Sequence, residues 1–215
     1  MSAIDAIAVL SGCFQAGGYL YYLMLARRGD IEPNPASWLM FAYGTGLIVV
    51  IEADIGAGWR ELLLPAVCAL SSIVVAAIAW RNRKAVMALS MSDLWTFWAD
   101  LALTVGYVSV WLLERAGHIG AGQRSAASIL ILGCALATTL TSFMPILRST
   151  IRNRSSEHVG PWLVWSAAYA LLLVATAFHP DAYVSAALLL YPAMNLVLHG
   201  TMVYLSYPKA GPRHV

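Results

Sequence analysis

Apolar residues run along this chain in long stretches, which are separated by short clusters of charged residues, glycine and proline. A helix that spans a bilayer needs about 20 mostly apolar residues. Cutting the chain at its polar clusters predicts seven such helices, at about 4–26, 35–54, 61–80, 93–113, 125–147, 160–178 and 182–206. The runs do not alternate between polar and apolar positions, which excludes a β-barrel. The pattern therefore predicts an all-α integral membrane protein.

Composition changes this picture only by excluding other classes of protein. Hydrophobic residues make up 60% of the chain and charged residues 11%, against roughly a quarter charged in soluble domains. So few charges cannot cover a soluble surface, and the net charge of +2 indicates no acidic partner. We therefore expect the lipid bilayer as the surrounding medium and no nucleic acid as a partner.

Basic residues predict the direction in which the chain crosses the membrane. Lys and Arg are concentrated in one set of connections and in the C-terminal segment, and the positive-inside rule places such segments in the cytoplasm. The N-terminus is then outside, in a plasma (inner) membrane. The residues on the basic side are Arg27, Arg28, Arg81, Arg83, Lys84, Arg148, Arg152, Arg154, Lys209 and Arg213, and those on the opposite side are Arg60, Arg115 and Arg124.

Three segments of the first half of the chain recur in the same order in the second half. Chance similarity among apolar helices is the alternative explanation. A repeat predicts two parallel triple-helix units joined by a linker helix, a 3+1+3 arrangement. The matching segments are Gly12-Cys13 with Gly133-Cys134, Trp38-Leu39-Met40-Phe41 with Trp162-Leu163-Val164-Trp165, and Leu64-Pro65-Ala66 with Tyr191-Pro192-Ala193.

The repeat divides the chain into four parts. Residues 1–86 form the first triple-helix unit, 87–120 the linker helix, 121–208 the second unit and 209–215 a cytoplasmic tail.

One stretch of the second unit carries a motif. It reads Ser142-Phe143-Met144-Pro145-Ile146-Leu147-Arg148, then a polar loop, then Gly160-Pro161-Trp162. This resembles the PQ-loop superfamily, which includes the SWEET and SemiSWEET sugar carriers, cystinosin-type amino-acid exporters and KDEL-receptor-like proteins. Ile146 stands where the family has glutamine, and Met24 stands where the first unit would repeat Pro145. The resemblance implies a carrier scaffold.

The last predicted helix offers a candidate binding site. Asn195 and His199 are four residues apart and share one helix face, near the depth at which repeat-built carriers bind their substrates. The resemblance implies a facing asparagine in the third helix, where this chain has Cys68. The alternative is that Asn195 and His199 make packing hydrogen bonds, with Thr138, Thr139 and Thr141 as partners.

Prolines and one acid complete the candidate residues. The resemblance implies that Pro145 and Pro161, and with them Pro33 and Pro35, act as hinges of an inner gate; ordinary helix starts and kinks are the alternative. Asp100 lies about two turns into the fourth helix, where it either couples transport to protons or pairs with an arginine of the preceding loop.

A second group of polar residues follows the second helix. We interpret Glu52 and Asp54, beside Arg60 and Glu61, as a solvated helix end, with the lining of an outer vestibule as the alternative.

We expect a carrier that moves a small polar solute, sugar-like or amino-acid-like, by alternating access; the alternative is a non-transporting receptor or assembly factor on the same scaffold. A retinal protein is excluded because a retinal Schiff base needs a lysine within the last helix. The only two lysines of the chain, Lys84 and Lys209, lie in polar segments. Without a hydrolase or metalloprotease motif, we expect no enzyme activity, catalytic residue, metal or cofactor. Formation of a homo-oligomer is left open.

The orientation is testable with a glycosylation sequon, Asn153-Arg154-Ser155. In a eukaryotic secretory membrane, Asn153 should stay unmodified because its loop faces the cytoplasm. A sequon engineered near His118 should be glycosylated, as a gel-shift assay with glycosidase treatment would show. Glycan on Asn153 would contradict the predicted orientation.

Overall fold

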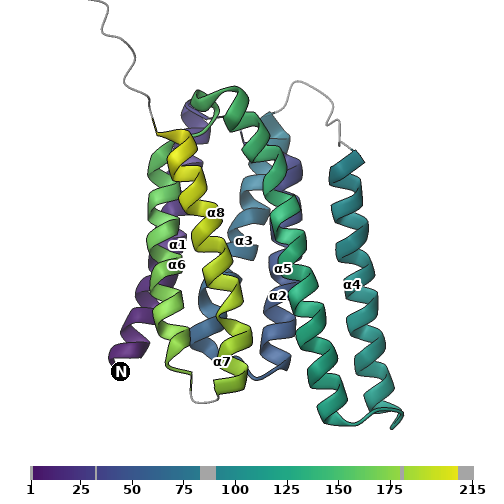
Figure 1. The fold of residues 1–215 in the computed structure, drawn as a ribbon. Helices are drawn as coiled ribbons and strands as arrows, with labels where there is room; N and C mark the ends of the chain where they lie inside the picture. Colours follow the sequence, from purple (N-terminus) through teal and green to yellow (C-terminus); the bar gives the residue numbers. More distant parts are fainter. Residues whose placement is uncertain (1, 32, 83–90, 180–181, 208–215) are drawn as a thin grey trace, which may run out of the picture.

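The computed structural model describes residues 2–31, 33–82, 91–179 and 182–207 (Figure 1). Within these ranges the chain is helical and contains no β-strand, which confirms the predicted all-α class. The elements are α1 (Ala3–Arg28), α2 (Pro35–Asp54), α3 (Trp59–Asn82), α4 (Met91–Arg115), α5 (Ala121–Arg152), the 3₁₀ turn η1 (Arg154–Ser156), α6 (Val159–Ala177), α7 (Ala182–Leu188) and α8 (Leu190–Ser206).

Seven helical segments of the described chain are long and apolar enough to cross a membrane, and they match the seven predicted runs. The last is built from α7 and α8 together. The predicted tail at 209–215 lies outside the described residues, as do Arg83 and Lys84. The protein is therefore an integral membrane protein by the length and composition of its helices.

Local capping explains where several helices begin and end. The Ser2 hydroxyl accepts a hydrogen bond from the Asp5 amide, while the Asp5 carboxylate accepts one from the Ser2 amide. These bonds satisfy two amides that the first helical turn leaves without partners. The Asn34 side-chain oxygen caps α2 by accepting hydrogen bonds from the Ala36 and Ser37 amides. Gly29 ends α1 with a positive φ of 78°, a conformation that glycine adopts without strain.

Two prolines shape helices whose outlines differ from the predicted ones. The run predicted at 125–147 continues to Arg152, because Pro145 removes only one backbone donor and the Asn153 amide still reaches the Ser149 carbonyl at 2.8 Å. In the last span, Pro192 cannot donate to the carbonyl of Leu188, and the helix is interrupted between α7 and α8.

The helices pack in a regular order (Figure 1). Helix α3 packs against both α1 and α2, and α8 packs against both α5 and α6. The two groups meet where α1 packs against α6 and where α2 packs against α5. Helix α4 lies at one side of the bundle, against α5 and α2.

Each end of the bundle gathers alternate connections. We call the end at which α1 begins the N-terminal face; it carries the α2–α3, α4–α5 and α6–α7 connections. We call the opposite end, where α8 finishes, the C-terminal face; it carries the α1–α2 and α5–α6 connections.

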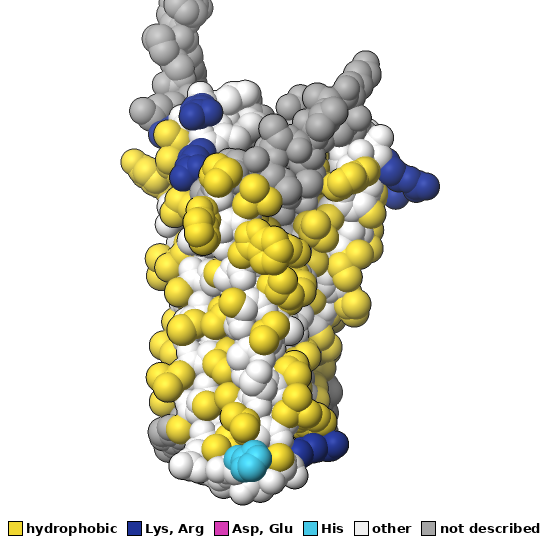
Figure 2. Space-filling view, turned by 90° about the vertical axis from the view of Figure 1, so that its right-hand side faces the viewer, with side chains coloured by type: hydrophobic (Ala, Val, Ile, Leu, Met, Phe, Trp, Pro, Cys, Tyr) yellow, Lys and Arg dark blue, Asp and Glu magenta, His cyan; other side chains and the backbone are white. Residues whose placement is uncertain are grey.

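The surface has the polarity that a bilayer requires. On the side that α4 occupies, hydrophobic side chains cover the middle of the molecule and basic side chains lie at its ends (Figure 2). Trp80, Trp95 and Trp98 are exposed near the ends of their helices, as expected of aromatic residues at a membrane–water boundary.

Acidic residues at the N-terminal face are not the solvated helix end that we expected. Glu52 and Glu61 are both buried. Asp54 forms an ion pair with Arg124, whose guanidinium also pairs with Glu114. These contacts join the end of α2 to α4 and α5. Arg60 pairs with Asp5 of α1 at 2.7 Å. The interpretation was wrong because the fold buries Glu52 and Glu61 and gives Asp54 and Arg60 charged partners on other helices.

The packing of α1 against α6 depends on a glycine. A Cβ on Gly18 would overlap the indole of Trp165, whereas a Cβ on Gly17 would meet no atom within 4 Å. We predict that Gly18→Ala destabilises the protein by about 1–3 kcal/mol through overpacking. Gly17→Ala is the matched control and should leave stability equal or slightly raised. Thermal unfolding of both variants in nanodiscs checks this, and equal melting temperatures would contradict it.

Candidate functional site

A small cavity lined by buried side chains lies at the centre of the bundle. It is about 20 Å³ as measured by the space open to the centre of a water molecule, and one water needs about 10–15 Å³ on that measure. The cavity therefore has room for about one water molecule. Its lining residues are Tyr19, Trp38, Phe41, Thr45, Cys68, Thr139, Phe143, Trp162, Trp165, Tyr169, Asn195 and His199.

The three residues that the sequence predicted for substrate binding meet at this cavity. Asn195 and His199 come from α8 and Cys68 from α3, and all three are buried. Asn195 donates its Nδ2 hydrogen to the carbonyl of Tyr191 at 3.0 Å, and His199 Nδ1 lies 2.7 Å from the Asn195 carbonyl oxygen. Both bonds stay within α8, so the threonines of α5 are not their partners. Thr139 instead donates to its own helix and lines the same cavity.

Aromatic rings form most of the cavity wall. Four rings surround the His199 imidazole, with centroids 4.7 Å away for Tyr169, 5.3 Å for Phe143, 5.4 Å for Trp162 and 5.9 Å for Trp165. Ring pairs at these separations contribute attraction beyond the area they bury. The imidazole is thus fixed on α8 by rings from α5 and α6.

Polar atoms converge on Cys68 from two sides. The Tyr19 hydroxyl lies 3.2 Å from the Cys68 Sγ and 2.8 Å from the Ser72 hydroxyl. The Tyr169 hydroxyl donates to the same sulfur at 3.8 Å and lies 3.2 Å from the Tyr191 hydroxyl. The cavity therefore offers hydroxyl, thiol, amide and imidazole groups set among aromatic faces.

Trp162 and Trp165 lie in the first two turns of α6 and line the cavity, a role that the sequence analysis did not assign to them. A signal for them exists in the spacing. Positions 38, 41 and 45 and positions 162, 165 and 169 follow the same i, i+3, i+7 pattern, which puts each set on one helix face. Both faces point into the cavity.

Glu157 is a buried polar residue that the sequence analysis did not single out. It lies between η1 and α6, and its side chain accepts hydrogen bonds from the Tyr22 hydroxyl at 3.0 Å and from the Trp162 indole at 3.2 Å. Burial raises the pKa of this carboxyl group from 4.5 to about 8, against the opposing effect of the two hydrogen bonds. No sequence motif predicts this residue, because its burial depends on contacts with Tyr22 of α1 and Trp162 of α6.

The candidate hinge prolines occupy three kinds of position. Pro145 lies inside α5, seven residues before its end at Arg152, and Pro161 lies in the first turn of α6. Pro35 is the first residue of α2 and Pro33 precedes its cap. Prolines at a helix start do not interrupt hydrogen bonding, so only Pro145 removes a bond within a helix. Their role in gating stays a prediction.

Asp100 does not share the cavity with Asn195. It is buried at 1% exposure where α4 meets α2, with its Oδ2 atom 3.5 Å from the place where a Cβ on Gly44 would lie. Its Oδ1 atom has no hydrogen-bond partner, and no ion pair joins Asp100 to a described arginine. A role in proton coupling remains a prediction for a separate site.

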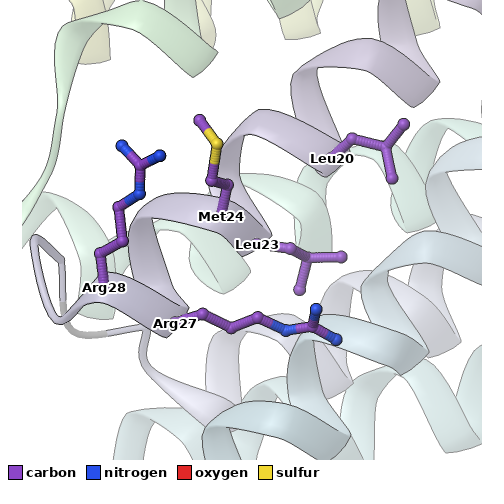
Figure 3. A pocket seen from close by; sticks show the side chains of 5 residues that line it. All are labelled: Leu20, Leu23, Met24, Arg27 and Arg28. Carbon is purple, nitrogen blue, oxygen red and sulfur yellow. The ribbon is translucent and has the colours of Figure 1, made fainter.

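Two further hollows lie on the outside of the bundle. One, of about 520 Å³, is mostly apolar and lies between α2, α3 and α4. The hydroxyls of two of its lining residues, Tyr43 and Thr104, form a hydrogen bond of 2.7 Å. The other, of about 340 Å³, is lined along α1 by Leu20, Leu23, Met24, Arg27 and Arg28 (Figure 3). Apolar side chains followed by arginines at a helix end are typical of a membrane–water boundary.

The part of the chain that the structure describes holds no cluster of three or more His, Cys, Asp or Glu side chains able to bind a metal ion. In comparisons with known proteins, the chain matches no family model, no curated protein and no solved structure.

Proposed function

We propose that this membrane protein is a carrier that moves a small polar solute by alternating access between two triple-helix units on a PQ-loop-like scaffold. The observation that carries the proposal is the central cavity, in which polar groups from α3 and α8 meet between the two groups of helices. The units would be residues 1–86 and 121–208, with α4 in the linker at 87–120. The basic connections favour a plasma-membrane location with the C-terminus in the cytoplasm.

The packing order supports the two-unit arrangement. Within each group the third helix lies between the first and the second, as α3 does for α1 and α2, and α8 for α5 and α6. The contacts between groups also correspond, since α1 with α6 and α2 with α5 exchange under a two-fold relation. Such a relation is what duplicated units joined by one extra helix would produce.

The cavity lining supports the same relation residue by residue. At a separation of 124, Trp38 corresponds to Trp162, Phe41 to Trp165 and Thr45 to Tyr169. At a separation of 127, Cys68 corresponds to Asn195. All eight residues line the cavity, so matched positions of the two halves face one another across it.

The chemistry of the lining favours an uncharged solute. Asp, Glu, Lys and Arg are absent from the described residues that line the cavity. A charged solute would lose its hydration there without a charged partner, at high cost. Hydroxyl and amide groups beside aromatic faces suit a polyhydroxylated, sugar-like molecule better than a zwitterionic amino acid.

A receptor or assembly factor is the second candidate, and the size of the cavity favours it. Space for about one water molecule holds no solute until the helices separate. In a receptor, aromatic packing alone would account for the buried rings. Flux decides between the two: proteoliposomes containing a carrier should equilibrate a labelled neutral solute, and those containing a receptor should not.

We predict that Asn195→Ala weakens solute binding by roughly 5- to 150-fold, because it leaves a polar group of the solute without its partner at a cost of about 1–3 kcal/mol. Thr201→Ala is the matched control, since Thr201 is an exposed polar residue of the same helix and its loss should not alter affinity. Affinity and melting temperature are measured on each purified variant, with a panel of neutral sugars as probes. A loss of stability with unchanged affinity would contradict the site assignment.

A further inference from the structure

One carboxyl group bridges the two groups of helices at the C-terminal face. Glu157 precedes α6 and is 5% exposed. Its Oε1 atom accepts a hydrogen bond from Tyr22 of α1, and its Oε2 atom accepts one from Trp162 of α6. Because α1 and α6 belong to different groups, separating them at this face would break one of these bonds.

The bridge lies directly against the wall of the cavity. Trp162 is itself a lining residue, and the Tyr22 ring packs on Trp38 at 4.9 Å and on Trp165 at 5.5 Å, both of which also line the cavity. The bonds to Glu157 therefore hold in place the rings that close the cavity toward the C-terminal face.

Among the residues that the structure describes, no basic side chain forms an ion pair with this carboxyl group. Burial without a counter-charge favours the neutral form of the acid. A phenol hydroxyl can donate or accept, so the bond to Tyr22 can persist when Glu157 is protonated. The charged or titratable side chains toward this end of the surrounding elements are Tyr21, Tyr22, Arg27, Arg28, Asp30, Arg148, Arg152, Arg154, His158, His199, Tyr204 and Tyr207.

We propose that Glu157 is a proton-binding latch, which holds a proton while the C-terminal face is closed and releases it when that face opens, so that access to the central cavity is coupled to proton concentration. This proposal rests on the proposed function in one respect, because it requires that the cavity opens at the C-terminal face. It requires no particular solute.

The direction of the coupling follows from proton linkage. An open face would expose Glu157 and return the pKa of its carboxyl group toward 4.5, whereas the closed face holds that pKa at about 8. Closure is therefore most favoured below about pH 4.5 and is progressively weakened as the pH rises to about 8. Each pH unit in this window favours opening by up to tenfold, and opening at neutral pH releases a proton.

Cys68 provides a native probe of opening, because it is buried at the cavity while Cys13 and Cys134 are exposed on the outside. In a Cys13→Ala, Cys134→Ala background in nanodiscs, the rate at which a water-soluble methanethiosulfonate reagent labels Cys68 is measured from pH 5 to pH 8. Dividing by the rate for the same background with Glu157→Gln removes the pH dependence of the thiol itself. We expect this ratio to rise at least tenfold across the range.

Two variants keep the test decisive. His158→Asn removes the neighbouring imidazole, whose Nδ1 atom accepts a hydrogen bond from the Gly160 amide at the start of α6, and should leave the rise intact. Tyr22→Phe removes one hydrogen bond of the latch and keeps the Glu157 carboxyl group, so labelling at pH 5 should increase at least several-fold over the parent background. A ratio constant within twofold from pH 5 to pH 8, or unchanged labelling in Tyr22→Phe, would overturn the latch whether or not the protein carries a solute.

Discussion

Contact between aromatic rings at the centre of the bundle is the interaction on which the rest of the structure depends. Trp38 of α2 and Trp165 of α6 lie 5.9 Å apart, with Tyr19 and Tyr22 of α1 packed against both. Such contacts need the helix backbones to approach closely, which Gly18 allows by leaving room for the Trp165 indole. This layer joins the two groups of helices and also closes the cavity between them.

The same layer of rings buries the two candidate binding residues of α8, Asn195 and His199, which still have hydrogen-bond partners. Asn195 and His199 make hydrogen bonds within α8, so their side chains are held without a partner from another helix. Between them and the C-terminal face lie the rings that Glu157 binds. A change at Glu157 would therefore act on the cavity through Trp162, which lines it, and through Tyr22, which packs on the lining residues Trp38 and Trp165.

Hydrophobic runs were sufficient to predict the seven spans, since a run of about 20 apolar residues has few alternatives to a membrane helix. They could not predict that α5 continues past Pro145, because whether a proline ends a helix or only interrupts one hydrogen bond depends on the neighbouring helices. Helical spacing predicted that Asn195 and His199 share one face, and the family resemblance implied that Cys68 faces them; all three line the cavity. The burial of Glu52 and Glu157 did not, because it depends on which distant helix covers each carboxyl group.

The central claim is that the two groups of helices move against each other about the aromatic layer. Pairs of spin labels test it most directly, with one pair replacing Asp30 and Arg152 at the C-terminal face and the other replacing Ala53 and Phe178 at the N-terminal face; all four positions are exposed. Double electron–electron resonance distances would be recorded in nanodiscs at pH 5 and pH 8, with and without neutral sugars. The account predicts that one face lengthens as the other shortens. If each pair of labels keeps the same distance under every condition, the account is contradicted.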